Sequence, residues 1–594
     1  MKHNYLKMGG LTALILIMFI VTLDSTITNI ALPAITSDFS STLTDSNWVS
    51  TVYMLTLSVF MIPGAKFADQ FGRKKLTTLG LLTFGIGSLM SGLAASLKLL
   101  VVARIIQGLG GAIISPVTVA LAVSLFGNRQ KAQGSIGIIG AAAALAAASG
   151  PAIGGLLIHY WSWRLIFFIN VPLVLLALFL LNSCFKESYD LSVSKKIDYF
   201  GITLLSFGLF LITFVLLKAS DYGWSSMKIL LMIVGASLSL AIFLLIEPKQ
   251  EAPLLDFSLF KNKSFVASLL IYMACGFTII CSSVVFNFFL EDILNYSTLK
   301  SGYIIMFSSL MVMVVVPIGN KFGQQNGYHW PIVLGTISMT TSLLLLANIN
   351  YHSTLFDMIF AMVILGMGFG LAGLSQISAV LHIPAQKVNL ASGIINAGRQ
   401  LGSCLGIALL VGLLNGNLKT ATQTIRHDAI ISVNQAQLSK VVKQSALAKI
   451  KSEIYYSGQL KHHNFNMASL KSVASKPQNF PCPKKGTSEY KLFISGKQFS
   501  KIEKKLAKKS TDLKTAANLM QLSKKQQQIS EKIMLESQAK ELNQVAHQIK
   551  DDKNEQLVKA FKKTFYVGML ILIFSIPAAF YTDVKVKSKI GPKI

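Results

Sequence analysis

Apolar residues fall into long runs along most of the chain, separated by short polar stretches. A helix needs about 20 predominantly apolar residues to cross the hydrocarbon core of a bilayer. The runs predict an all-α membrane protein with 14 transmembrane helices. The predicted spans are 8–32, 48–66, 76–95, 99–124, 134–158, 165–185, 199–217, 228–246, 265–290, 302–319, 331–347, 355–382, 393–415 and 565–581.

Lysine and arginine are distributed unevenly between the short loops. Lys66, Arg73, Lys74 and Lys75 lie between the second and third spans, whereas residues 36–47 hold two aspartates and no base. Cytoplasmic loops of membrane proteins carry the excess of basic residues. Both termini, and the loops that follow even-numbered spans, are therefore expected to be cytoplasmic.

One connection, residues 416–563 between the last two spans, is much longer than the others, and the topology places it outside the cell. It holds 28 Lys and Arg against 11 Asp and Glu, a net +17 of the chain's +29. Long segments are translocated largely regardless of charge. Apolar residues at helical spacing predict helices over 424–450 and 499–561, with a Pro- and Gly-bearing break at 455–496. A helical hairpin is expected; a partly disordered tether is the alternative.

These segments divide the chain into five expected parts. They are an N-terminal six-helix bundle (1–198), two linker helices with a cytoplasmic loop (199–264), helices 9 to 13 of a C-terminal bundle (265–415), the basic extracellular insertion (416–563), and helix 14 with a cytoplasmic tail (564–594).

Composition narrows the function. The chain is 52% hydrophobic and 14% charged, against about 25% charged in soluble domains, which excludes a soluble enzyme. The nine histidines and five cysteines show no metal-ligand spacing, and no catalytic constellation or phosphate-binding loop is apparent, so neither metal nor cofactor is expected. Nucleic-acid binding is not expected, because the basic insertion is predicted outside and lacks an aromatic stacking pattern.

Two ionisable residues lie inside predicted spans at similar depth. A charge at mid-membrane costs about 2.5–3.5 kcal/mol on insertion scales. Asp24 in span 1 and Arg104 in span 4 are therefore expected to be paired or to have a function. A carboxylate in a low dielectric can load and release protons near neutral pH. The alternative is a static ion pair that only satisfies the buried charges.

Three further patterns each allow a structural or a transport role. Gly150-Pro151 and Gly154-Gly155 follow an Ala- and Gly-rich run in span 5, as expected for a bendable gate or for ordinary close packing. Arg399 and Gln400 lie near the cytoplasmic end of span 13. They either line a transport path or extend to the membrane interface. The loop with Gly64, Asp69, Gly72 and Arg73 either locks the cytoplasmic face or is a plain basic turn, and a weaker copy at 317–327 suggests two related halves.

Several of these motifs, in order, resemble the major facilitator superfamily, and within it the fourteen-spanner drug:proton antiporters of QacA and EmrB type. The resemblance rests on Leu23–Pro33 in span 1, the Gly64–Lys75 loop, Arg104–Gly111 in span 4, Gly150–Gly155 in span 5, Trp163–Pro172 in span 6 and Ser392–Gly402 in span 13.

The resemblance implies two six-helix bundles plus two extra helices, and alternating access driven by the proton gradient. It assigns proton coupling and substrate contact to Asp24, Arg104, Asn29 and Gln107, the gate to Gly150, Pro151, Gly154 and Gly155, the cytoplasmic lock to Gly64, Asp69, Gly72 and Arg73, and a transport path to Asn396, Arg399 and Gln400. Members that export dications carry further acids in the second half. No acid is expected to be buried in spans 9 to 14 here, because Asp357 and Glu291 lie at outer ends; this favours monovalent, amphipathic or even anionic substrates.

The leading hypothesis is a bacterial plasma-membrane exporter of amphipathic, cationic or neutral toxic compounds by proton antiport. Export of a lipid or cell-envelope precursor is the alternative within transport. A third hypothesis is an envelope-interaction protein whose basic insertion binds anionic lipid or cell-wall polymer. The expected partners are thus small amphipathic substrates, protons and membrane lipid.

Overall fold

The structure is a computed structural model, which describes residues 2–41, 43–127, 129–189, 198–250, 253–381, 383–384, 387–453, 485–486 and 488–583. Every regular element within these residues is helical. The chain forms two compact units, residues 1–413 with 562–594 and residues 414–561. The cytoplasmic tail expected from residue 584 onward lies outside the described residues.

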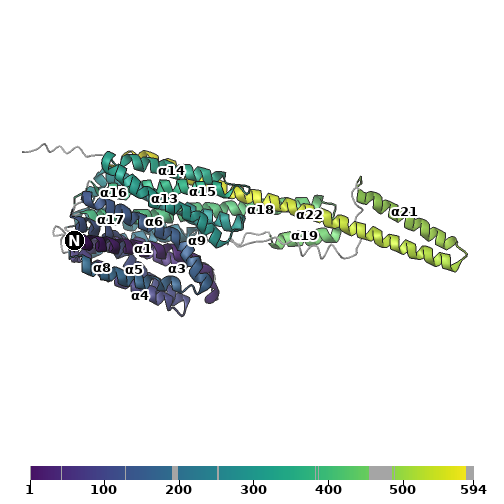
Figure 1. The fold of residues 1–594 in the computed structure, drawn as a ribbon, viewed down its shortest axis with the longest axis horizontal. Coiled ribbons are helices and arrows are strands. Elements are labelled where there is room, and N and C mark those ends of the chain that lie inside the picture. The colour runs from purple at the N-terminus through teal and green to yellow at the C-terminus, as the bar shows by residue number, and fades with distance from the viewer. Residues whose placement is uncertain are drawn as a thin grey trace, which may run out of the picture. The chain divides into compact units, whose positions relative to one another are not determined.

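The larger unit is a bundle of long helices (Figure 1). Its first half contains α1 (Lys2–Asp38), α2 (Leu43–Ser46), α3 (Trp48–Phe71), α4 (Arg73–Gly92), α5 (Leu97–Phe126), α6 (Arg129–Tyr160), α7 (Leu165–Phe168) and α8 (Asn170–Cys184). The linker contains α9 (Tyr199–Tyr222), α10 (Met227–Ile246), a 3₁₀ turn (Glu247–Lys249) and α11 (Ser258–Lys261). The second half contains α12 (Lys263–Ile280), α13 (Thr298–Asn326), α14 (His329–Asn348), α15 (Leu355–Ala372), α16 (Ser375–Leu381), α17 (Val388–Gly406) and α23 (Ile576–Ala579).

Eleven of the helices in the described part of the chain are long and apolar enough to cross a membrane. A twelfth apolar stretch, Gly134–Ala147 in α6, is shorter. The chain is therefore a multi-pass membrane protein. All fourteen predicted spans fall on helices, but the count of fourteen crossings stays a prediction, since α4 and the end of α22 do not meet that standard.

Several predicted spans are interrupted rather than continuous. The predicted span 355–382 divides at Gly373 into α15 and α16, and the N–H of Gly373 donates to the carbonyl of Phe369 at 2.9 Å. π-helical turns follow α12 at Cys281–Phe286 and Phe289–Ile293, and follow α17 at Ile407–Val411. Such breaks survive in membrane helices only where the freed backbone groups find partners, and π turns recur at functional sites.

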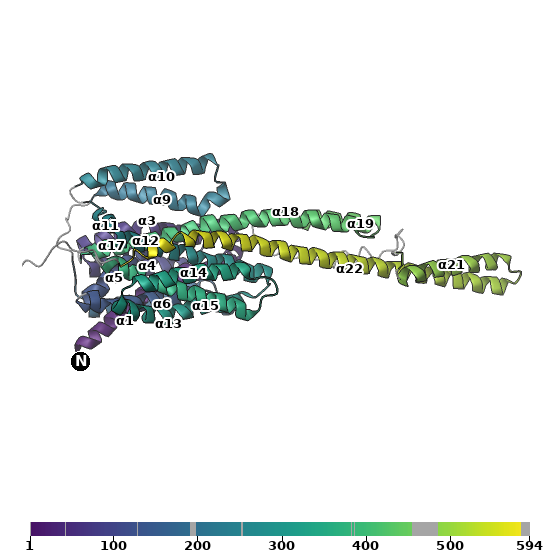
Figure 2. The same cartoon turned by 90° about the horizontal axis from the view of Figure 1, so that it is seen from above.

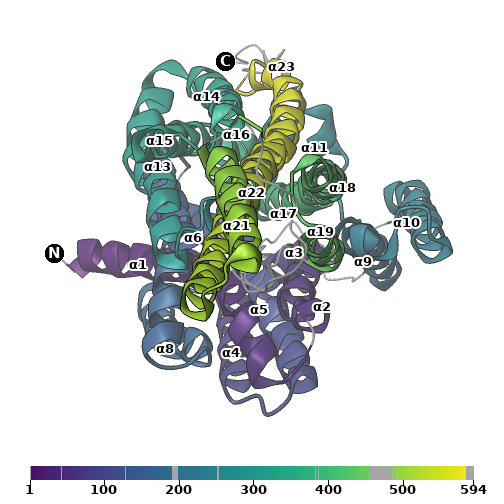
Figure 3. The same ribbon diagram turned by 90° about the vertical axis from the view of Figure 1, so that its right-hand side faces the viewer.

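Helices α9 and α10 form a pair beside the two halves of the bundle (Figures 2 and 3). They pack on each other, and α9 also contacts α3 and α17. The hydroxyl groups of Ser58 on α3 and Thr213 on α9 are 3.2 Å apart and buried, which gives this apolar contact one polar link. These are the two extra helices that the sequence places between the bundles.

The smaller unit, residues 414–561, holds most of α18 (Gly412–Gln435), α19 (Lys440–Glu453), α21 (Ser488–Lys509) and most of α22 (Leu513–Ile573). The helical stretch expected over 499–561 is helical but interrupted: α21 ends at Lys509 and α22 begins at Leu513. Asp512 causes the turn, because its carboxylate accepts hydrogen bonds from the N–H groups of Lys514 and Thr515 at 3.1 and 3.2 Å. The expected break at 455–496 lies mostly outside the described residues.

The helix expected over 424–450 is also interrupted. α18 ends at Gln435, and α19 begins after Ser439, whose hydroxyl accepts a hydrogen bond from the N–H of Val442 at 3.3 Å. The side-chain oxygen of Gln538 on α22 accepts from the Ser439 N–H at 2.7 Å, which holds the turn in place. A buried cluster from α18, α19 and α22 forms the core here; its members include Val433, Leu438, Val442, Ile450, Leu542, Val545 and Ile549.

Helix α21 packs on α22 through small residues. The hydroxyls of Ser500 and Ser523 are 2.9 Å apart, and a Cβ at Gly496 would lie 2.7 Å from Ser530 Oγ. The large apolar side chains of α21 therefore point elsewhere. Leu492, Phe499, Ile502 and Leu506 are exposed and form one stripe at helical spacing.

The core of the smaller unit provides a matched pair of substitutions on α18. Val433→Asp buries an unpaired charge in a position with no exposed surface, which costs about 3–5 kcal/mol. Ile431→Asp places the same charge on a side chain that is 40% exposed and serves as the control. Hydrogen exchange of peptides from 414–453 should speed up for Val433→Asp alone; equal protection in both variants would contradict this core.

Candidate functional site

The strongest polar cluster of the larger unit surrounds the carboxylate of Asp24 on α1. Arg104 Nη1 on α5 donates to Asp24 Oδ2 at 2.5 Å. Gln107 Nε2 donates to Asp24 Oδ1 at 2.8 Å, and Asn170 Nδ2 on α8 donates to the same oxygen at 3.1 Å. All four side chains are fully buried. The carboxylate is thus held by three donors from two other helices.

Arg104 is fixed from several directions. Its Nε donates to the carbonyl of Val49 at 3.1 Å, and its Nη1 also donates to Gln107 Oε1 at 2.8 Å. Its guanidinium carbon lies 4.0 Å from the ring centroid of Tyr53, a cation–π geometry. The Tyr53 hydroxyl in turn donates to the carbonyl of Val21 at 3.3 Å. The cluster therefore joins α1, α3, α5 and α8.

This arrangement defines what the cluster can do chemically. Removing one partner of a buried ion pair costs about 3–5 kcal/mol, because the other charge is left uncompensated. Protonation of Asp24 removes its charge, and with it the charge-assisted character of every hydrogen bond that it accepts. Within the described residues, Arg104 Nη2 and Asn170 Oδ1 are buried without a hydrogen bond. The cluster can therefore rearrange when the carboxyl group gains a proton.

Sequence reasoning found Asp24, Arg104 and Gln107 but left Asn170 and Tyr53 out of the site. Asn170 is a buried amide at the start of the apolar helix α8, and it also donates to Ser88 Oγ at 3.1 Å. A polar residue among apolar neighbours was the available signal. Nothing in the sequence marks Tyr53, since an aromatic residue in a span is ordinary.

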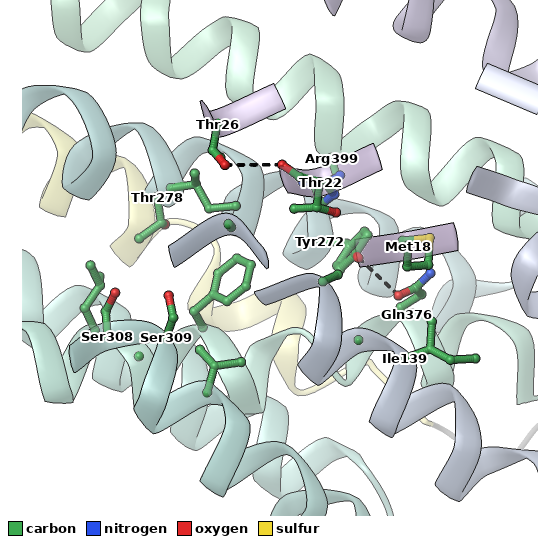
Figure 4. Close-up of a pocket in the computed structure, with 18 of the residues that line it drawn as sticks. Met18, Thr22, Thr26, Ile139, Tyr272, Thr278, Ser308, Ser309, Gln376 and Arg399 are labelled. Atoms are coloured by element: carbon green, nitrogen blue, oxygen red, sulfur yellow. Dashed lines mark hydrogen bonds between the residues drawn. The ribbon is translucent and has the colours of Figure 1, made fainter. Parts of the chain in front are cut away.

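A cavity of about 170 Å³ lies between the two halves of the bundle (Figure 4). Residues from α1, α5 and α6 line it on one side, and residues from α12, α13, α15, α16 and α17 line it on the other. Asn29 is one of them, together with Met18, Thr22 and Thr26 of α1. These four recur at helical spacing on the face of α1 opposite Asp24, so Asn29 belongs to the cavity rather than to the carboxylate cluster.

The three residues proposed for a path in span 13 separate in the structure. Arg399 lines the cavity, and its guanidinium carbon lies 6.0 Å from the Tyr272 ring centroid. Asn396 is fully buried, and its amide donates to the carbonyl of Ser392 at 2.9 Å. Gln400 is buried as well and does not line the cavity. The Tyr272 hydroxyl donates to Gln376 Oε1 at 3.1 Å, as Figure 4 shows.

The glycines predicted for the gate lie in α6, against α1. A Cβ at Gly150 would lie 2.2 Å from Thr26 Oγ1, and one at Gly154 would lie 2.8 Å from Ile27 Cγ1. Gly155 has nothing within 4 Å of its Cβ position. The backbone of Pro151 continues α6, and its side chain lies outside the described residues. Two of the glycines therefore permit close contact of α6 with α1.

The predicted cytoplasmic loop is held by local contacts. Asp69 Oδ1 accepts hydrogen bonds from Arg73 Nε and Nη2 at 2.9 and 2.8 Å. Gly72 has φ +108°, and its missing Cβ leaves room for Glu187, whose carboxylate accepts from the N–H groups of Lys74 and Lys75. This cap stabilises the N-terminus of α4, where an acidic group is favourable.

The glycine at the start of that loop has a different task. A Cβ at Gly64 on α3 would lie 3.1 Å from the carbonyl oxygen of Ala112 on α5. Gly64 therefore permits close approach of two helices within the first half, whereas Asp69, Gly72 and Arg73 shape the turn between α3 and α4.

The two halves meet on the side where α3 ends. The Asn389 amide on α17 donates to the carbonyl of Ala65 at 2.5 Å, and a Cβ at Gly393 would lie 2.9 Å from Ala65 Cβ. Lys387, before α17, forms an ion pair with Asp256. These contacts close the bundle beside the loop that carries Asp69. The sequence did not single them out, because they join distant segments.

Another ion pair, Asp38 with Arg164, lies at the C-terminal end of α1, beyond the apolar span. Asp38 Oδ2 accepts from Arg164 Nη1 at 2.8 Å and from Trp163 Nε1 at 3.1 Å. These hydrogen bonds, Arg164 first, hold the pKa of Asp38 below its usual value. Arg164 also donates to the carbonyl of Ala94 at 3.3 Å. The pair therefore anchors α1 to neighbouring segments outside the span.

Among the described residues no group of three His, Cys, Asp or Glu could hold a metal ion.

Comparison with known proteins agrees with this architecture. A model of the Major Facilitator Superfamily matches residues 14–407. The multidrug resistance protein Stp of Mycobacterium tuberculosis H37Rv is 29% identical over 436 residues, 72% of this chain and 80% of Stp. The tetracenomycin C resistance and export protein of Streptomyces glaucescens is 31% identical over 392 residues, 66% of this chain and 72% of that protein.

A solved structure shares the fold. The crystal structure of the human organic anion transporter MFSD10 (TETRAN) superposes with a TM-score of 0.51 and 13% sequence identity. The match covers 68% of this chain and 93% of that chain. At this identity the likeness concerns the fold alone.

The glycines of α6 provide a matched pair of substitutions. Gly150→Ala places a methyl group against Thr26 Oγ1, so α1 and α6 must move apart, whereas Gly155→Ala meets open space. We expect Gly150→Ala to lower the thermal unfolding temperature of the detergent-purified protein, with a cost of about 1–3 kcal/mol for overpacking. Gly155→Ala should unfold like the wild type. Identical unfolding of both variants would show that α6 does not pack this closely on α1.

Proposed function

The chain belongs to the Major Facilitator Superfamily, and on that premise we propose that it is a proton-coupled efflux transporter that exports amphipathic small molecules by alternating access. Members of this family are transporters rather than enzymes. One observation carries the proposal: α1 holds a titratable carboxylate on one face and lines the central cavity with the other.

The coupling follows from the rigidity of a helix. Asp24 lies between Thr22 and Thr26 in sequence, but on the opposite face of α1. When Asp24 is ionised, Arg104, Gln107 and Asn170 hold α1 against α5 and α8. A proton on Asp24 weakens these bonds and releases α1 to shift, which changes the cavity wall at the same time. Proton binding and substrate binding then shift the same equilibrium, between α1 held against α5 and α8 and α1 released from them.

Close packing supports the transmission of movement from α1 to α6, and the names of the relatives support export as the direction of transport. Gly150 and Gly154 bring α6 into contact with α1 beside the cavity, so a movement of α1 reaches α6 directly. The matched relatives are named for drug resistance, and one of them for export. Under this proposal the imported proton supplies the energy, and no nucleotide or other cofactor is required.

The proposed location is the bacterial plasma membrane, with both termini in the cytoplasm and residues 416–563 outside. In this orientation the contacts of Ala65 with Asn389 and Gly393 close the cytoplasmic side. The loop with Asp69 and Arg73 then lies at this cytoplasmic face, where its hydrogen bonds hold the turn between α3 and α4.

A second candidate function concerns the insertion, and a specific observation favours it. Helix α21 carries seven lysines against two glutamates and an exposed apolar stripe, a combination suited to anionic lipid or cell-wall polymer. We propose this as an accessory role or, in the alternative, as the handling of a lipid or envelope precursor. The triple variant Lys491→Gln/Lys501→Gln/Lys508→Gln on α21 tests this role. Its binding to anionic vesicles should be weaker than that of the wild type, and wild-type binding should weaken with added salt.

Proton movement tests the main proposal. Purified protein is reconstituted into liposomes that contain a pH-sensitive dye, and benzenesulfonate, benzenesulfonamide or benzyltrimethylammonium is added. We expect at least one compound to drive proton movement in the wild type. Asp24→Asn should abolish this movement, because an amide cannot carry the proton.

Asp551→Asn, an exposed carboxylate outside the larger unit, is the control for loss of one acid and should behave like the wild type. Thermal unfolding of each variant establishes that it is folded. Proton movement that persists in folded Asp24→Asn would move the coupling site elsewhere and refute the assignment.

A further inference from the structure

The cavity between the two halves has an uneven balance of charge. None of the described residues that line it is Asp, Glu, Lys or His, and its one charged side chain is Arg399. The carboxylate of Asp24 does not compensate for it, because that carboxylate is fully buried against Arg104 on the far face of α1. The cavity therefore carries a net positive charge.

The guanidinium group of Arg399 lacks the partners that Arg104 possesses. It makes no hydrogen bond or ion pair with any described residue, and its central carbon lies 6.0 Å from the centroid of the Tyr272 ring. Its backbone is held firmly: a Cβ at Gly276 on α12 would lie 2.0 Å from the Arg399 carbonyl oxygen. An unpaired guanidinium group with five N–H donors is suited to a carboxylate, sulfonate or phosphate group.

The other polar groups of the cavity add no negative charge. The hydroxyls of Thr118, Thr278 and Ser308 donate to carbonyls of their own helices at 2.7–2.8 Å, so their protons are occupied. The side-chain amide of Gln376 accepts from Tyr272, which leaves its two N–H groups without a partner among the described residues. The lining thus offers N–H donors near Arg399 and no carboxylate to receive a cation.

Besides these groups and the polar residues Thr22, Thr26, Asn29, Asn287 and Ser309, the lining is apolar. It includes Ile30, Val119, Ile136, Val312, Leu365 and Phe369. The volume of about 170 Å³ is close to the ~150 Å³ of an apolar cavity that binds benzene, so one aromatic ring fits this state.

We propose that the cavity binds small amphipathic organic anions, with the anionic group on Arg399 and the ring against the apolar wall. This inference rests on the proposed function only in taking the cavity as the transport cavity. It replaces the leading sequence-based hypothesis of cationic or neutral substrates with the anionic alternative that the sequence also left open, because a cation here meets an unpaired guanidinium group. Arg399 is thus the residue that selects substrates by charge.

Binding of three single-ring compounds that differ in charge tests the proposal. Isothermal titration calorimetry of the full chain in neutral detergent compares benzenesulfonate, benzenesulfonamide and benzyltrimethylammonium. We expect the sulfonate to bind most tightly and the quaternary ammonium most weakly. This comparison uses only the wild type, so it does not depend on the folding of any variant.

Three variants then assign the selection to one side chain. Arg399→Gln should weaken benzenesulfonate binding by about ten- to a hundredfold, as expected for loss of a charge-assisted hydrogen bond, and should leave benzenesulfonamide little changed. Arg399→Lys should retain most of the affinity. Lys228→Gln on α10 removes an exposed cation outside the cavity and should bind like the wild type.

Tighter binding of benzyltrimethylammonium than of benzenesulfonate to the wild type would overturn the proposal, and so would unchanged sulfonate affinity in folded Arg399→Gln. The measurement needs no proton gradient, so its outcome is separate from that of the coupling experiment. Sulfonate binding at Arg399 without proton coupling would refute the antiport mechanism alone, whereas proton-coupled transport of the ammonium compound alone would refute the anion site.

Discussion

The buried ion pair of Asp24 and Arg104 is the constraint on which the first half of the bundle depends. Two charges without contact to water are tolerable only when each is compensated, and here the compensation requires α1, α3, α5 and α8 to meet at one point. In the proposed mechanism, the same requirement makes the cluster sensitive to one proton. The atoms that the fold needs for charge compensation are then also the atoms of the proposed switch.

In the proposed mechanism, helix α1 transmits the protonation state of this cluster, because its two faces lie in different environments. One face carries the carboxylate, the other lines the cavity, and the glycines of α6 allow direct backbone contact beside Thr26. On the other side of the cavity, α17 carries Arg399 and is held equally closely by α12 at Gly276. The charged pair of the first half is buried away from the cavity, whereas Arg399 of the second half lines it. In the proposed mechanism, this asymmetry separates proton handling from substrate selection.

Much of the fold could be predicted, and the failures have physical causes. Hydrophobic run length located the helices, since a membrane helix must be apolar along its whole length. It could not locate the break at Gly373 or the turn at Asp512, because single residues and their tertiary partners decide whether a helix continues. In the candidate site, Asp24 and Arg104 were found because charges inside spans are rare. Asn170 and Tyr53 were missed, because an amide or an aromatic ring in a span has many ordinary roles.

The sequence by itself determined the class of protein, the position of the helices and the presence of two charges that had to be reconciled inside the membrane. These properties depend on composition and local periodicity, which are written along the chain. The tertiary structure alone decided which side chains meet. It put Asn29 in the cavity rather than beside Asp24, buried Asn396 and Gln400, and left Arg399 facing the cavity without an acid. Contacts between helices far apart in sequence depend on their rotation about their own axes, and a single sequence does not specify that rotation.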